Sequence, residues 1–195
     1  MARTYHLKLW IVSIFLFGGL IANAFSTDLV YINTTEGSER LLNSTHNRQY
    51  FSLASYVDTQ ERLTFCGISS MSATLNSLPT VVRPVTPELA PHPYFTEDSI
   101  FNEATTKIKS RDDVLKSGLT LEQIGLYLNA LNANPKVYYG SDLTVAELRK
   151  VIQSSLANRY QRVMVDFDRQ ACHTTICRLT TEIRIGSKCL NINSH

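Results

Sequence analysis

Residues 60–70 read Gln60-Glu61-Arg62-Leu63-Thr64-Phe65-Cys66-Gly67-Ile68-Ser69-Ser70. From there apolar residues recur at spacings of three and four, and this pattern predicts a helix that ends before Pro79. Its apolar face consists of Ile68, Met71, Leu75 and Leu78. Cys66 opens the helix, where the positive end of the peptide dipoles favours the thiolate, the reactive form of cysteine. The stretch therefore presents a candidate nucleophile at a helix N-terminus.

Gln60, six residues before the cysteine, is a candidate partner in acyl-transfer chemistry. During such a reaction the oxygen of the attacked carbonyl becomes negative, and a side-chain amide N–H beside the backbone N–H of the nucleophile stabilises it. The residues alone leave an alternative open, in which Cys66 is a buried structural cysteine and Gln60 a surface residue. Free cysteine is indeed among the most buried residue types.

The first 24 residues have the pattern of a secretory signal peptide. A basic start is followed by an apolar run from Leu9 to Ile21, which is short for a membrane span, and by the small-x-small sequence Ala22-Asn23-Ala24. We expect cleavage near Ala24, export to the periplasm or the medium, and no stable membrane span after processing. An uncleaved membrane anchor is the alternative.

The balance of charge and the distribution of cysteines narrow the function further. With 19 Lys plus Arg against 17 Asp plus Glu, the chain has no basic field for nucleic acid, so we expect no nucleic-acid partner. Four cysteines in an exported chain would ordinarily form two disulfides. Here Cys66 stands alone and the other three crowd the end of the chain, so Cys66 is the functional candidate.

The rest of the chain is helix-rich first and strand-bearing later. Residues 80–93 are rich in proline and predict an irregular surface loop. Thr96, followed by two acidic residues, predicts a capped helix through about Ile108. Two capping boxes and two short apolar runs predict the remaining elements: helices that start at Thr120 and Thr144, and strands at residues 136–139 and 163–167.

The segment from Asp58 to Leu78 resembles the nucleophile segment of phytochelatin synthases, and the exported bacterial members are the nearest in pattern. Six shorter segments agree with the family, in its order, between about residues 30 and 169. They are Thr35-Glu36-Gly37, Tyr50-Phe51-Ser52-Leu53, Phe95-Thr96-Glu97-Asp98, Phe101-Asn102-Glu103, Gly118-Leu119-Thr120-Leu121 and Val163-Met164-Val165. Collinear agreement of this kind is more specific than any single motif.

The resemblance implies an α+β fold of the papain-like cysteine peptidase type, with a helical half followed by an incomplete antiparallel sheet half. It implies attack on the γ-Glu-Cys–Gly bond of glutathione, with Cys66 as the nucleophile and Gln60 in the oxyanion hole. Water then gives γ-glutamylcysteine, whereas transfer to a second glutathione gives phytochelatin. Hydrolysis needs no cofactor, and heavy-metal ions such as Cd and Zn stimulate transfer as glutathione thiolates. The expected partners are glutathione and related thiol peptides.

The family also uses a histidine and an aspartate from the sheet half, and here the sequence departs from the pattern. The Gly-Gly-His-x-Ser-Pro-like segment expected a few residues after Arg169 is absent, as is the later aspartate segment. We therefore expect a catalytic domain at residues 25–170, cut short before both residues, and a divergent tail at residues 171–195 from an altered reading frame or a truncated gene. A chain of this kind is expected to be inactive or nearly so, because it lacks the acid that protonates the departing amine.

Alternatives remain for the tail and for the function. His173 lies near the expected position of the base, and Cys172, His173, Cys177 and Cys189 are an alternative soft-metal site, although their spacing fits no established zinc pattern well. His46 and His92 are predicted to be solvated loop residues. Two alternative functions remain. The chain is either a papain-like peptidase that acts on other peptides, or an inactive remnant that binds thiol peptides or metals.

Overall fold

The computed structural model describes residues 30–166 and the backbone of residues 188–193. The predicted signal peptide and three tail candidates, Cys172, His173 and Cys177, lie outside these residues. The described elements, in chain order, are α1 (Thr35–Leu42), α2 (Arg48–Ala54), the short 3-10 helix η1 (Leu63–Phe65), α3 (Cys66–Ser77), α4 (Glu97–Ile100), α5 (Glu103–Thr106), α6 (Arg111–Ser117), α7 (Leu121–Ala130), β1 (Pro135–Tyr138), α8 (Val145–Leu156), β2 (Gln161–Asp166) and β3 (Lys188–Asn193).

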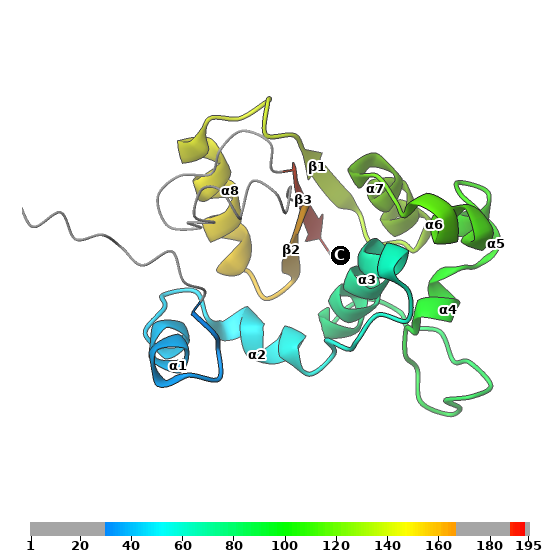
Figure 1. The fold of residues 1–195 in the computed structure, drawn as a ribbon, viewed down its shortest axis with the longest axis horizontal. Helices are drawn as coiled ribbons and strands as arrows, with labels where there is room; N and C mark the ends of the chain where they lie inside the picture. The colour runs from blue at the N-terminus through cyan, green and yellow to red at the C-terminus, as the bar shows by residue number, and fades with distance from the viewer. Residues whose placement is uncertain (1–29, 167–187, 194–195) are drawn as a thin grey trace, which may run out of the picture.

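The three strands form one small antiparallel sheet in the order β1-β3-β2 (Figure 1). In its register Leu190 of β3 lies between Val137 of β1 and Met164 of β2. The two predicted strands are confirmed as β1 and β2, but no element was predicted at residues 188–193. β3 comes from the segment that we interpreted as a divergent tail, and it joins the two predicted strands because it pairs with both.

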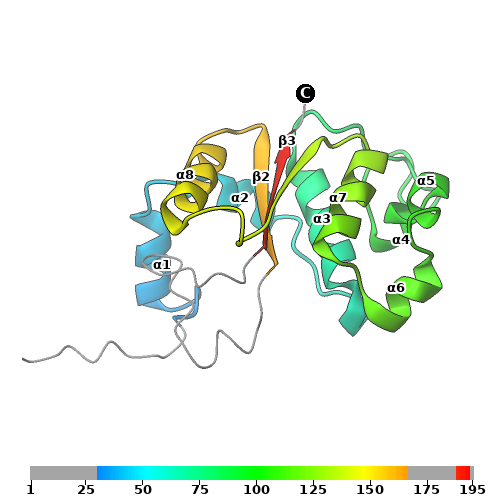
Figure 2. The same ribbon diagram turned by 90° about the horizontal axis from the view of Figure 1, so that it is seen from above.

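The sheet lies between two groups of helices, with α1, α2 and α8 on one side and α3 to α7 on the other (Figure 2). This mixture of many helices with a few antiparallel strands is compatible with the predicted α+β class. Within the described residues, no helix is both long enough and apolar enough to cross a membrane.

The core is built around α3, which packs against α4 and α7. The predicted apolar face of α3 is confirmed, since all four of its residues are fully buried. Polar residues of α3 are buried as well, and Asn76 shows how they are satisfied. Its side chain accepts the backbone N–H of Phe95 at 2.9 Å and donates to the Phe95 carbonyl at 2.8 Å. A buried amide is tolerated there because both of its polar ends are paired.

The three predicted N-caps, Thr96, Thr120 and Thr144, are confirmed, each with reciprocal capping-box hydrogen bonds. The prediction of one helix from Thr96 to about Ile108 is wrong, because the segment forms two short helices, α4 and α5. Asn102 lies between them, and its side-chain oxygen accepts the backbone N–H groups of Ala104 and Thr105. This second cap starts a new helix and so ends the first.

Candidate active site

Cys66 is the first residue of α3 and is exposed. No side chain caps the start of α3, since the N-cap residue Phe65 forms no side-chain hydrogen bond there. The first N–H groups of a helix have no partner within the helix, and they point in the direction from which an anion approaches. Because Cys66 is exposed, the alternative of a buried structural cysteine is wrong.

Phe65 and Gly67 explain why the cysteine faces outward. The side chain of Phe65 is fully buried, with its ring centroid 5.5 Å from that of Phe101. On the other side of the cysteine, a Cβ added to Gly67 would lie 3.2 Å from Cδ1 of Ile124 on α7. A buried aromatic ring before Cys66 and a close helix contact after it orient this turn, so that the residue between them is directed to the surface.

The short helix η1 is held to the end of α6 by contacts distant in sequence. The Thr64 hydroxyl donates to the carbonyl of Leu115 at 3.1 Å. Gly118 follows α6 with a φ of 65°, and a Cβ added there would lie 3.3 Å from the Thr64 carbonyl oxygen. Both the positive φ and the close approach favour glycine at this position. These contacts position the turn that carries Cys66.

The loop before η1 is held by charged residues of the segment that carries α4 and α6. The Glu61 backbone N–H donates to the carboxylate of Glu97 at 3.1 Å. Arg111 forms ion pairs with Asp98 at 3.0 Å and with Glu61 at 3.9 Å. The sequence indicated Glu97 and Asp98 only as part of a helix cap, and it gave no sign of the positioning role of Arg111. A contact across 36 residues leaves no local pattern that could have indicated it.

Gln60 lies in this same loop and is half-buried. Its amide Nε2 donates to the carbonyl of Arg62 at 2.6 Å, which fixes the side chain against its own loop. An amide nitrogen carries two hydrogens, so one N–H remains for another acceptor. The structure gives no hydrogen bond between Gln60 and Cys66, and the role of Gln60 in an oxyanion hole stays a prediction.

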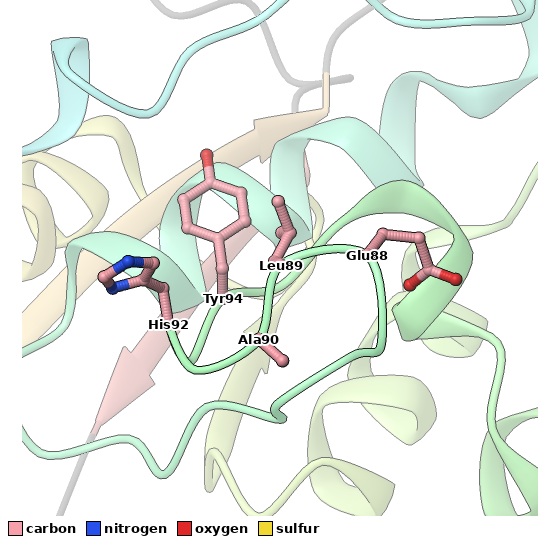
Figure 3. Close-up of a pocket in the computed structure, with 5 residues that line it drawn as sticks. All are labelled: Glu88, Leu89, Ala90, His92 and Tyr94. Carbon is pink, nitrogen blue, oxygen red and sulfur yellow. The ribbon is translucent and has the colours of Figure 1, made fainter.

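The described histidines do not lie beside the cysteine. His92 belongs to the predicted proline-rich loop and is exposed, as predicted. It lines a shallow pocket of about 360 Å³ with Glu88, Leu89, Ala90 and Tyr94, and the His92 ring and the Glu88 carboxylate point to opposite sides of the loop (Figure 3). His46 is only half-exposed and lines a different pocket, at the far end of α3.

No side chain in residues 30–166 forms a hydrogen bond with Cys66 that could fix the position of its thiol. Residues of that part of the chain also form no cluster of three or more His, Cys, Asp or Glu side chains with the geometry of a metal site. The backbone of Cys189 lies in β3, paired with Tyr138 and Val165, and the other residues of the alternative metal site lie outside the described residues. The metal interpretation of the tail stays a prediction.

Comparison with known proteins gives one family. The model of the family described as phytochelatin synthase matches residues 21–176, which include the whole of η1, α3 and the helices that support them. No curated protein matches the chain.

Proposed function

The chain belongs to the phytochelatin synthase family, whose members are enzymes that act on glutathione, and from that premise we propose that Cys66 attacks the γ-Glu-Cys–Gly bond of glutathione. The observation that carries the proposal is an exposed cysteine at the uncapped N-terminus of a buried helix. The packing of α3 against strand β2, with the cysteine at the N-terminus of that helix, also supports a papain-like arrangement of the domain. Because the family acts on glutathione, glutathione is the substrate to test first.

The reaction has two steps. The thiolate of Cys66 adds to the carbonyl carbon of the Cys–Gly amide, and the carbonyl oxygen takes the negative charge. The backbone N–H of Cys66 and the remaining N–H of Gln60 are the proposed donors to that oxygen. When the C–N bond breaks, glycine leaves as an amine that takes up a proton, and a thioester to Cys66 remains. Water or the amino group of a second glutathione then releases the γ-glutamylcysteinyl group.

We propose that this chain turns over slowly. A basic partner maintains the thiolate of a catalytic cysteine and returns a proton to the leaving amine. Neither described histidine contacts Cys66, and the alternative base, His173, lies outside the described residues. In hydrolases that lose a member of the triad, the oxyanion hole and substrate binding alone retain about 10³ to 10⁴ of the acceleration over water. Glycine release at that level is the expected activity.

The remaining parts of the proposal concern the setting of the reaction. We propose that the chain is exported after cleavage near Ala24 and that residues 25–170 form its catalytic domain, followed by the tail. Hydrolysis then needs no cofactor. Cd or Zn enters as the thiolate of glutathione, hence as part of the substrate and not as a resident metal.

The test is the release of glycine from glutathione by the purified protein, compared with its Cys66→Ala variant. Ser70→Ala is the matched control, because Ser70 is another small exposed residue on the same helix. We expect slow release that Cys66→Ala abolishes and Ser70→Ala leaves unchanged. Glutathione binding without release would favour the inactive remnant, and faster cleavage of an unrelated peptide would favour a general peptidase.

A further inference from the structure

A second polar pocket lies at the opposite end of α3 from Cys66. Its volume is about 560 Å³, within the range of small-molecule sites, and it is walled by α2, by the last residues of α3 and α8, and by the turn before β2. Figure 1 shows α2 beneath the loop that connects α8 to β2. Since α3 has 12 residues, this pocket is about 16 Å along the helix from the cysteine.

The ionisable residues that line this pocket are all basic. Arg48, Arg159, Arg162 and His46 line it, and no described Asp or Glu does. None of the five ion pairs among the described residues involves these arginines. Arginine is the side chain whose planar set of donors best matches carboxylate and phosphate oxygens.

Arg162 lines the pocket and is almost fully buried, with only 4% of its surface exposed. Its guanidinium donates to the hydroxyl of Ser77 at 2.9 Å and to the carbonyl of Ser77 at 2.7 Å, and also to two carbonyls of its own turn. All four acceptors are uncharged, and burial lowers the pKa of Arg162. This arginine caps the C-terminus of α3, where a cation is favoured, and so has a structural role of its own.

Gln49 forms the opposite wall. Its amide donates to the carbonyls of Ser155 at 2.7 Å, Leu156 at 3.1 Å and Asn158 at 2.8 Å, which ties α2 to the C-terminus of α8. Two helix C-termini therefore meet at the pocket. Each end carries roughly half a negative charge, so together they offset about one of the three guanidinium charges and leave about two.

The remaining positive charge of the pocket is carried by Arg48 and Arg159, which are both exposed. Neither caps a helix end through a hydrogen bond in the described residues, although Arg159 lies over the ring of its neighbour Tyr160 at 5.3 Å. Capping thus accounts for Arg162 but not for the other two cations. Two exposed arginines that line a polar pocket, with no described carboxylate among its other lining residues, are an arrangement suited to binding an oxyanion.

We infer that this pocket binds a small molecule that carries a phosphate or polycarboxylate group, with Arg48 and Arg159 as its direct ligands and Arg162 as the buried support. The site is separate from the proposed chemistry, because the length of α3 keeps its ligand out of reach of Cys66. It stands whether or not the chain releases glycine from glutathione.

The test is isothermal titration calorimetry, in which the purified full chain is titrated with pyrophosphate and, separately, with citrate. About 0.1 M NaCl screens distant charges. We expect saturable binding of one ligand per chain, with pyrophosphate or citrate preferred according to which group the site takes. Arg48→Ala and Arg159→Ala should each weaken binding about tenfold, since each removes a charge-assisted hydrogen bond. Both residues are exposed, so these variants should keep the fold, which circular dichroism checks.

Two controls distinguish binding in this pocket from binding elsewhere on the chain. Lys150→Ala removes an exposed cation from α8 outside the pocket, and Cys66→Ala removes the candidate nucleophile, so both should bind as the unmodified chain does. The inference is overturned if neither anion binds saturably, or if Arg48→Ala and Arg159→Ala bind as tightly as Lys150→Ala.

Discussion

Arg111 lies over the ring of Phe65, with its guanidinium carbon 5.3 Å from the ring centroid, and Phe65 immediately precedes Cys66. The same guanidinium lies 5.8 Å from the ring centroid of Phe101 and forms the ion pairs with Asp98 and Glu61. One side chain at the start of α6 thus connects the loop before the candidate nucleophile with the aromatic residue that anchors it.

Replacing Arg111 by Ala should destabilise the fold by about 1–2 kcal/mol. A partly exposed cation–π contact is worth about 0.5–1 kcal/mol, and exposed ion pairs add between about 0 and 1 kcal/mol. Urea denaturation measures the difference. Arg40→Ala, which removes an exposed ion pair with Glu36 on α1, should change the free energy of unfolding by less than about 0.5 kcal/mol. Equal effects in both variants would contradict a role for the ring contacts.

Replacing Asn76 by Ala should be more damaging, by about 2–4 kcal/mol, because it leaves the buried backbone N–H of Phe95 without a partner and removes one of the two donors to the Phe95 carbonyl. Ser72→Ala is the matched control. The Ser72 hydroxyl donates to the same Phe95 carbonyl at 2.6 Å, but that carbonyl keeps Asn76, so the expected loss is only about 1 kcal/mol. Thermal and urea unfolding should rank the two variants in this order, and the reverse order would contradict the assignment.

Replacing Gly118 by Ala should cost about 1–3 kcal/mol, because its φ of 65° with a ψ of −156° is a conformation that side chains rarely adopt. The added Cβ would also press on the Thr64 carbonyl, and η1 would shift. Ser117→Ala, at the preceding exposed residue, should stay within about 0.5 kcal/mol. The measurement is again the free energy of unfolding, and a neutral Gly118→Ala variant would show that the turn relaxes freely.

The N-terminus of α8 should lose stability in acid. The backbone N–H of Thr144 and then its hydroxyl donate to Glu147, and these bonds lower the pKa of that carboxyl below its ordinary 4.5. A lowered folded-state pKa means that the stabilisation is present above the unfolded value and disappears as pH falls below it. Urea midpoints between about pH 6 and pH 3 should therefore fall less steeply in Glu147→Gln. Parallel curves for the two proteins would contradict this contribution.

Gln60→Glu tests the proposed oxyanion donor, because the substitution keeps the shape of the side chain and removes its N–H groups. Any glycine release should fall about a hundredfold to a thousandfold in kcat, with little change in KM, since the lost bond forms only in the transition state. Gln153→Glu, on the exposed face of α8, should leave the rate unchanged. An unchanged kcat in Gln60→Glu would remove Gln60 from the site but not Cys66.

Several elements follow from short-range sequence alone. The bounds of α3, its buried apolar face and the N-caps at Thr96, Thr120 and Thr144 were all predictable, because each depends on residues within one or two helical turns. The break between α4 and α5 also depends on nearby residues, because the side chain of Asn102 caps the second helix. The prediction missed it because the cap at Thr96 fits the start of a longer helix equally well.

The residues that hold the candidate site together could not be read in this way. The carboxylate of Glu97 accepts the backbone N–H of Glu61, and the side chain of Asn76 accepts that of Phe95. Strand β3 pairs between β1 and β2. Each contact joins segments far apart in sequence and depends on side chains that any surface helix could carry. The same is true of the pocket around Arg162, where Arg48 of α2 is brought to Arg159 and Arg162 around the start of β2.

The sequence by itself determined that a cysteine opens a helix, and its match to the family determined the class of chemistry. Local hydrogen bonds and apolar spacing suffice for the first conclusion, because helix ends are set by neighbours in the chain. Only the tertiary structure decided that Cys66 faces outward while Phe65 is buried, and that the arginines gather at the far end of α3. Exposure and charge clustering depend on which segments pack together, and that packing is a property of the whole chain.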